Sequence, residues 1–191
     1  MSWMLTASGR KVVVDAIEPG DVAIEDIAAH LAKICRFTGA CRILWSVAEH
    51  SVLVADIVAQ RHPHDIDMQL CGLLHDAPEA YLQDLATPVK NLISDYKALE
   101  LAAWYAIAER WGLPLSLPMA VKMADIVALA TERRDIMPAH PEAWSILEGI
   151  RPQALRIGAT ERHWKEAERL FLDRFHQLIG LRMQGGARLV N

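Results

Sequence analysis

The chain has 191 residues, of which 52% are hydrophobic and 23% are charged, and its formal net charge is −4. This length leaves room for one domain with a buried core, and the apolar content argues against a disordered chain. The negative net charge argues against a protein that binds nucleic-acid polymers through a basic face.

The first 20 residues are expected to form an extended N-terminal arm or hairpin. A run of β-type residues at 11–15 is followed by the turn signal Glu18-Pro19-Gly20. From residue 21 to about residue 180 the apolar residues recur with the 3.6-residue period of helices, and residues 181–191 are expected to be a C-terminal tail. The pattern predicts an all-α fold, with a single helical domain behind a short N-terminal arm.

Capping and helix-breaking residues indicate where individual helices begin and end. Asp21 and Ser46 are suited to be N-caps, Pro78 marks a boundary or a kink, and Gly112 follows a long helix. The expected helices cover about residues 21–34, 46–62, 65–77, 92–111, 118–135 and 160–179. The apolar face of the last helix is expected to contain Trp164, Ala167, Leu170, Phe171 and Phe175.

Three apolar segments contain residues of the metal-ligand type. His50 lies within one predicted helix, and the adjacent His75 and Asp76 end the next. Asp125 lies among Ala, Val, Ile and Met in a third. Taken singly, His50 fits a hydrogen-bonded core histidine, and Asp125 fits an acid that caps a helix or pairs with a base.

Taken together, these residues indicate a cation site. Burying a lone carboxylate costs several kcal/mol, whereas two imidazoles and two carboxylates on three helices can compensate one another through one shared ion. A mixed nitrogen and oxygen site suits Mn²⁺, Co²⁺, Fe²⁺ or Zn²⁺ better than Mg²⁺, which prefers oxygen ligands alone. We therefore expect one divalent cation as cofactor.

The order of these ligands resembles that of the HD-domain metal-dependent phosphohydrolases, whose motif is a histidine, a His-Asp pair and a later aspartate. The closest likeness is to the bacterial 5′-deoxynucleotidases, and it spans roughly residues 24–132. Arg36-Phe37 stands where that family has an arginine and an aromatic residue. The other runs that carry the resemblance are VAEHS at 47–51, HDAPE at 75–79, DLATPVK at 84–90 and KMAD at 122–125.

The resemblance implies a role for each matched residue. The metal ligands would be His50, His75, Asp76 and Asp125. The catalytic residues would be Glu79, which orients or deprotonates the attacking water, and Asp84, a second candidate for proton transfer. The substrate-binding residues would be Arg36 on the phosphate, Phe37 on the sugar or base, and Thr87 in the pocket. This sequence has Phe37 where the nucleotidases have tryptophan, and Pro78 where they have a small polar residue, so sugar selectivity and the presentation of Glu79 can differ.

The activity implied is hydrolysis of a small phosphorylated substrate, most simply removal of the 5′-phosphate from (deoxy)nucleoside monophosphates. The alternatives are another HD-type nucleotide hydrolase, acting on a triphosphate, a cyclic nucleotide or an alarmone, or a non-catalytic module that binds a metal and a nucleotide. The resemblance also favours a homodimer. Lys90 and Lys97 fit either phosphate contacts or surface positions, and Glu132 with Arg133-Arg134 is expected to be a solvated helix end.

The remaining sequence features concern location. Cys35, Cys41 and Cys71 lack paired metal-ligand spacing and fit reduced thiols. No apolar run reaches the roughly 18 residues of a membrane span, and the N-terminus lacks a signal-peptide pattern. We expect a cytoplasmic protein without membrane contact.

Overall fold

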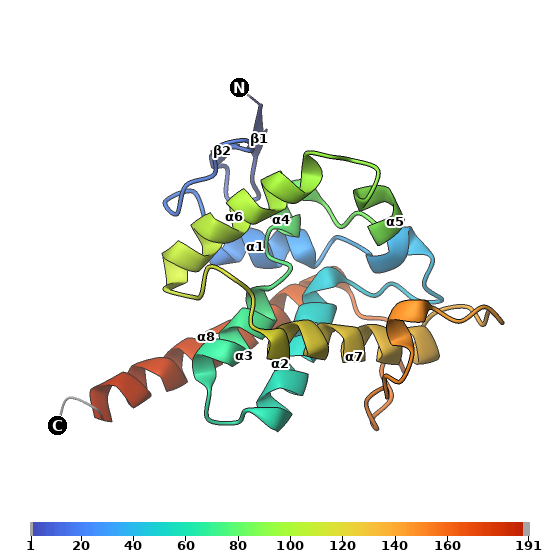
Figure 1. The fold of residues 1–191 in the computed structure, drawn as a ribbon. Coiled ribbons are helices and arrows are strands. Elements are labelled where there is room, and N and C mark those ends of the chain that lie inside the picture. Colours follow the sequence, from blue (N-terminus) through green and yellow to red (C-terminus); the bar gives the residue numbers. More distant parts are fainter. Residues whose placement is uncertain (1, 189–191) are drawn as a thin grey trace.

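A computed structural model describes residues 2–188 and shows a mostly helical chain with one small two-stranded sheet (Figure 1). The antiparallel strands are β1 (Trp3–Leu5) and β2 (Lys11–Val13), and Met4 pairs with Val12. The helices are α1 (Ile24–Leu31), α2 (Val47–Arg61), α3 (Ile66–Leu74), α4 (Glu79–Leu82), α5 (Thr87–Lys90), α6 (Tyr96–Trp111), α7 (Met119–Asp135) and α8 (Trp164–Arg188). Two 3₁₀ turns cover Arg36–Gly39 and Ser145–Leu147. Among the described helices, none combines the length and apolar character needed to cross a bilayer.

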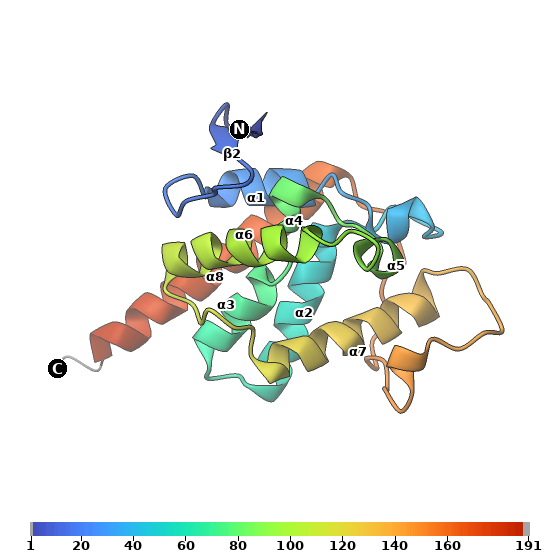
Figure 2. The same ribbon diagram turned by 45° about the horizontal axis from the view of Figure 1, so that its top comes forward.

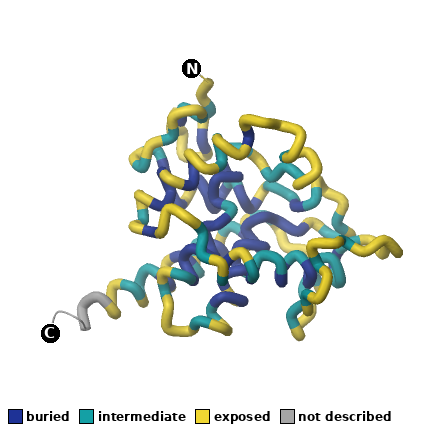
Figure 3. The backbone as a smooth tube through the Cα atoms, viewed as in Figure 1, coloured by how far each residue is buried: buried dark blue, intermediate teal, exposed yellow. Residues whose placement is uncertain are grey.

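Helix α2 is the centre of the core. It packs against α3, α7 and α8, and the deeply buried stretches of the chain gather around it (Figure 1, Figure 3). Helix α8 contributes Ala167, Phe171, Phe175 and Leu178, whose spacing of three or four residues places them on one buried face. Each large apolar side chain removed from water in this way contributes roughly 1.5–3 kcal/mol.

Local sequence signals set several helix boundaries as predicted. Ser46 forms a capping box, because its hydroxyl accepts the Glu49 backbone N–H (3.2 Å) while the Glu49 carboxylate accepts the Ser46 N–H (3.0 Å). Gly112 ends α6 in the left-handed region, with φ of +63°. These contacts confirm the expected start of α2 and the expected end of α6.

The predicted cap at Asp21 is wrong. Its carboxylate accepts the Glu18 backbone N–H (3.0 Å) within a turn, and α1 begins only at Ile24. The helical period of apolar residues begins at Val22, but the turn at residues 18–21 precedes the helix, so α1 starts later than this period predicts. Similarly, the segment 92–95 is not helical, and the short α5 lies in what was expected to be a loop.

The last helix also differs from its prediction. Helix α8 starts at Trp164 and runs to Arg188, so most of the expected C-terminal tail is helical, and residues 189–191 lie outside the described range. In both views α8 extends past the other helices (Figure 1, Figure 2). Leu170 is 36% exposed rather than buried, because it lies at the edge of the face that contacts the core.

The N-terminal hairpin is tied to the helical body through α1. Ser8 donates from its backbone N–H (2.6 Å) and its hydroxyl (2.7 Å) to the two carboxylate oxygens of the buried Asp26. His30 accepts the Ala7 backbone N–H at Nε2 (3.0 Å) and contacts the Ala80 carbonyl at Nδ1 (2.7 Å). This chain of contacts fixes α4, and with it Glu79 at its first position, relative to α1.

Candidate metal centre

His50, His75 and Asp76 meet where α2 and α3 pack against each other. His50 lies in the first half of α2, and the other two follow the end of α3. The approach is close because Gly72 faces α2, where an added Cβ would lie 3.1 Å from Val58 Cγ2 and 3.3 Å from the Ala55 Cα. The absence of a side chain at this position lets the end of α3 reach the middle of α2.

The donor atoms of the three residues converge on one point. His50 Nε2 lies 3.3 Å from His75 Nε2 and 3.4 Å from Asp76 Oδ2, and His75 Nε2 lies 3.2 Å from the same oxygen. Two ligand atoms bound to one cation at about 2.0–2.2 Å lie roughly 3.0–3.5 Å apart. The separations therefore fit a metal site, and this group of three could hold an ion.

The hydrogen bonds of the two Nδ1 atoms determine the protonation of the two Nε2 atoms, which face each other. His75 Nδ1 lies 2.9 Å from the Gly72 carbonyl, which can only accept, so this nitrogen carries a proton. His50 Nδ1 lies 2.7 Å from the buried Glu132 carboxylate and donates to it in the same way. In the neutral rings both Nε2 atoms are then bare acceptors, and two acceptors at 3.3 Å need a cation or a proton between them.

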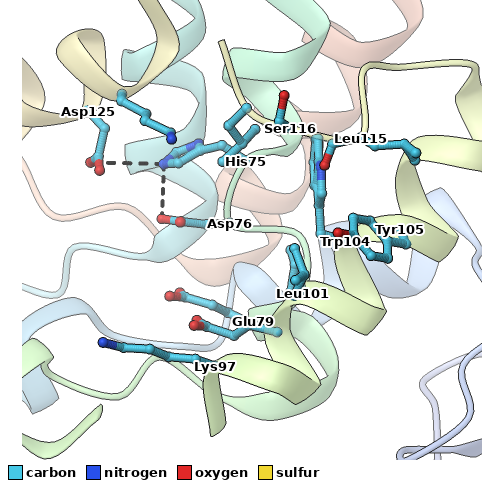
Figure 4. A pocket seen from close by; sticks show the side chains of 14 residues that line it. His75, Asp76, Glu79, Lys97, Leu101, Trp104, Tyr105, Leu115, Ser116 and Asp125 are labelled. Carbon is cyan, nitrogen blue, oxygen red and sulfur yellow. Dashed lines mark hydrogen bonds and ion pairs between the residues drawn. The ribbon is translucent and has the colours of Figure 1, made fainter. Parts of the chain in front are cut away.

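Asp125 approaches this group from α7. Its Oδ1 lies 3.2 Å from His50 Nε2 and 3.9 Å from His75 Nε2. Figure 4 shows His75 in contact with both Asp76 and Asp125 at the edge of a pocket. The structure thus brings the four residues of the sequence prediction together.

The charges of the cluster favour protonation of His50 and ionisation of Asp76. Burial and Arg36 oppose protonation of His50, but Glu132 and Asp125 outweigh them and raise its pKa to about 10. Burial would raise the pKa of Asp76, yet His75, His50 and Arg36 hold it far below its usual range. The carboxylates around His50 therefore favour its protonated form, and the positive groups around Asp76 favour its ionised form.

Glu132 is a residue of the candidate site that sequence reasoning missed. Its predicted position at a solvated helix end is wrong, because the residue is fully buried. Its Oε1 accepts from His50 Nδ1 (2.7 Å) and Trp45 Nε1 (2.8 Å). Its Oε2 lies 3.2 Å from Arg36 Nη2. The signal was present in the sequence, since Glu132 follows Asp125 by seven residues and therefore lies on the same face of α7.

Arg36 and Phe37 enter the site from the 3₁₀ turn after α1. Arg36 is buried, and its guanidinium lies 3.5 Å from Asp76 Oδ2 as well as against Glu132, so it is already engaged with two carboxylates. Phe37 and Thr38 both have φ of +55°, a left-handed conformation that costs roughly 1–2 kcal/mol for a residue with a Cβ. Strain of this kind is concentrated at functional sites.

Glu79 lies beside the cluster with one oxygen free. Its Oε1 accepts from Lys90 Nζ at 3.0 Å, while its buried Oε2 has no partner among the described residues. Burial, Asp76 and Asp84 raise its pKa well above the usual value despite Lys90. Burial also raises the pKa of Asp84, against the opposing charge of Arg36. Both carboxyl groups are therefore suited to exchanging protons.

These side chains surround a cavity of about 810 Å³. Its walls include Arg36, Phe37, Glu79, Asp84 and Thr87, together with Asp76 and Asp125 of the candidate metal group. Trp144, in the segment between α7 and α8, lines the same cavity, and its ring centroid lies 6.1 Å from that of Phe37. The sequence contained no signal for Trp144, because a loop of irregular structure brings it there.

Comparison with known proteins places the chain among relatives of nearly equal length. No model of a known protein family matches it. It is 39% identical over 182 residues to the uncharacterized protein YfdR of Escherichia coli (strain K12), which covers 95% of this chain and 98% of YfdR. The chain belongs to the YfdR family. A second relative, the uncharacterized protein RCAP_rcc00048 of Rhodobacter capsulatus, is 39% identical over 188 residues, covering 93% of this chain and 96% of that protein.

In this member of the YfdR family, three kinds of group therefore border one cavity. The histidine and aspartate cluster could hold a cation, Glu79 and Asp84 can carry protons, and Arg36 adds a buried positive charge. The names of the two relatives state no activity. The chemistry of the site is thus the basis for any functional assignment.

Proposed function

We propose that this protein is a divalent-metal-dependent phosphohydrolase of the HD-domain superfamily, and that it removes the 5′-phosphate from (deoxy)nucleoside monophosphates. One observation carries the proposal. The donor atoms of His50, His75 and Asp76 converge beside the free carboxylate oxygen of Glu79, at the edge of a cavity large enough for a nucleotide. Asp125 lies close enough to complete the set.

Mn²⁺, Co²⁺, Fe²⁺ and Zn²⁺ all suit two imidazoles and two carboxylates. A divalent cation held by these residues supplies charge neutralisation for the phosphoryl group and lowers the pKa of a water. The chain then supplies the proton transfers. The unpartnered Oε2 of Glu79 can accept a proton from the attacking water, and Asp84, whose pKa is raised, can protonate the leaving oxygen.

Arg36 has two functions in this proposal. It neutralises Asp76 and Glu132, which orients a metal ligand and the carboxylate behind His50. Its guanidinium also lines the cavity, where its remaining N–H groups can donate to a phosphate oxygen. Thr87 lines the same cavity.

The aromatic side chains of the cavity favour a nucleoside as the leaving group. Phe37 and Trp144 are inclined at 43° to each other and form a corner against which a planar base can pack. The Arg133 guanidinium lies 5.1 Å from the Trp144 ring centre and covers part of that ring. A simple sugar phosphate would leave this apolar corner without a partner.

A phosphate-release assay with Mn²⁺ or Co²⁺ tests the proposal on nucleoside mono-, di- and triphosphates, with separate detection of pyrophosphate. Asp76→Ala or His75→Ala should abolish turnover and metal retention together. Glu79→Gln should keep the metal and lose roughly 10²–10⁴-fold in kcat, the usual contribution of a general base. Asp15→Ala, at an exposed position in the hairpin region, is the matched control and should behave like the wild type.

The panel also separates the alternatives. Release of pyrophosphate from triphosphates would assign the site to another nucleotide hydrolase. Binding of nucleotides in calorimetry without any phosphate release would identify a binding module. Turnover that survives loss of either ligand would contradict the metal assignment itself.

A further inference from the structure

A second cavity, of about 440 Å³, reaches the same candidate metal centre from the side of α6 and α7. Asp76, Glu79 and Asp125 border both this cavity and the wider one described above. Figure 4 shows the second cavity, with His75, Asp76 and Asp125 at one end and Leu101, Trp104 and Tyr105 at the other. The centre is therefore open on two sides, although a phosphate monoester has only one organic group.

Some of the positively charged side chains around the centre already form ion pairs with carboxylates, and others do not. Arg36 is paired with Asp76 and Glu132, and Lys90 with Glu79 (3.0 Å) and Glu100 (2.7 Å). Both belong to the wider cavity.

The second cavity contains the two lysines whose charge is available. Lys97 lies in the first turn of α6 and Lys122 in the first turn of α7, and both line this cavity. Within residues 2–188, neither forms an ion pair. Glu79 and Glu100, the acids of this cavity outside the metal group, both pair with Lys90.

The unpaired positive charges lie on the side of the second cavity, and this difference between the two sides would orient a phosphate at the centre. The terminal oxygens of a monoester carry the negative charge, whereas the ester oxygen leads to the organic group. Ammonium groups on flexible stems act as mobile point charges for such oxygens. The apolar corner of Phe37 and Trp144 lies in the other cavity, so the nucleoside and the terminal oxygens have separate environments on the two sides.

We propose that Lys97 and Lys122 form an anion subsite on the α6–α7 side of the candidate metal centre, which holds the terminal oxygens of the substrate's phosphate. The proposal rests on the proposed function for its substrate. Its test uses inorganic phosphate, which needs no turnover.

The experiment measures phosphate affinity by calorimetry on the Mn²⁺-loaded full chain. The test variant carries Lys97→Gln and Lys122→Gln. The matched control carries Lys11→Gln and Lys165→Gln, which remove two exposed lysines on β2 and α8 and change the net charge equally. An exposed ion pair contributes up to about fivefold in affinity, so losing two should weaken phosphate binding by roughly 5- to 25-fold. Affinity for Mn²⁺ should not fall, because no ligand is removed.

The controls decide whether charge at these positions is responsible. The double variant Lys97→Arg with Lys122→Arg should restore phosphate affinity to within about threefold of the wild type, since it keeps both charges. An unchanged phosphate Kd in the glutamine variant, an equal loss in the Lys11 and Lys165 control, or no phosphate binding by the metal-loaded wild type would each overturn the subsite.

The outcome is independent of the hydrolysis assay. If no nucleotide is hydrolysed but phosphate affinity depends on Lys97 and Lys122, the subsite stands and the proposed function fails. If nucleotides are hydrolysed but replacing the two lysines leaves phosphate affinity unchanged, the proposed function stands and the subsite is wrong.

Discussion

Replacing Glu132 by glutamine tests how His50, a candidate metal ligand, is held. In the wild type, Oε1 accepts from Trp45 and His50 while Oε2 faces the Arg36 guanidinium. A glutamine of the same shape has one acceptor oxygen and one NH₂ donor. Whichever way the amide is oriented, its NH₂ meets a donor from Arg36 or from Trp45 and His50. The substitution also removes one of the two negative charges that face Arg36.

The cost follows from burial. Glu132 is inaccessible to solvent, and removing one member of a buried charge pair costs about 3–5 kcal/mol. Because Arg36 keeps Asp76 at 3.5 Å, we expect the lower end of that range. For a chain of this size each kcal/mol shifts the Tm by about 2–4 °C, so the Tm should fall by roughly 6–12 °C. Loss of the carboxylate behind His50 should also weaken Mn²⁺ binding by about 10–100-fold.

Melting followed by circular dichroism, without metal, measures the first effect, and calorimetry with Mn²⁺ measures the second. The control is Glu148→Gln, which makes the same chemical change at an exposed position and should alter neither quantity. A Glu132→Gln protein with the Tm and Mn²⁺ affinity of the wild type would refute the argument that Glu132 holds His50 and Arg36 in place.

Two further predictions concern the segment after α7. Gly158→Ala should destabilise the fold by about 2–5 kcal/mol in urea unfolding, because its φ is +68° and the new Cβ would lie 2.4 Å from Ile136 Cγ2. Gly149→Ala, with φ of +74° but no atom within 4 Å, should cost only the backbone strain of about 1–2 kcal/mol, and equal losses would contradict the packing argument. Arg134 binds both carboxylate oxygens of Asp135 and depresses its pKa, so this carboxylate stabilises the fold above its unfolded pKa and the contribution is lost as the pH falls through the folded value. Asp135→Asn should therefore be about 1–3 kcal/mol less stable at pH 7, and its difference from the wild type should shrink below about pH 4. A difference that is constant from pH 7 to pH 3 would show that the charge of Asp135 is not what matters.

Sequence reasoning was most successful where the cause is local. The helix start at Ser46 and the helix end at Gly112 depend on residues within a few positions, and both predictions are confirmed. The predicted N-cap at Asp21 was wrong because the Asp21 carboxylate accepts the Glu18 N–H instead, and this local interaction forms a turn. The predicted start of α6 was wrong because the apolar residues at 92 and 93 continue the helical pattern of the sequence, although residues 92–95 are not helical.

In the candidate site, too, some features were predictable from the sequence and others were not. The four predicted ligands do come together, because buried acids and histidines in apolar helices have few other ways to be satisfied. The engagement of Arg36 by Glu132 joins residues 96 positions apart in the chain, and Trp144 reaches the cavity through an irregular loop. No periodicity encodes such contacts.

The amino-acid sequence by itself determined that the chain is helical, where α2 and α7 begin and end, and which side chains could share a cation. These properties follow from backbone hydrogen bonding and from the cost of burying charge, which act along one helix at a time. Only the tertiary structure decided that Glu132 holds His50, that Gly72 lets α3 approach α2, and that the centre opens on two sides. Those features depend on the packing of separate helices, where a shift of about 1 Å decides whether two groups touch.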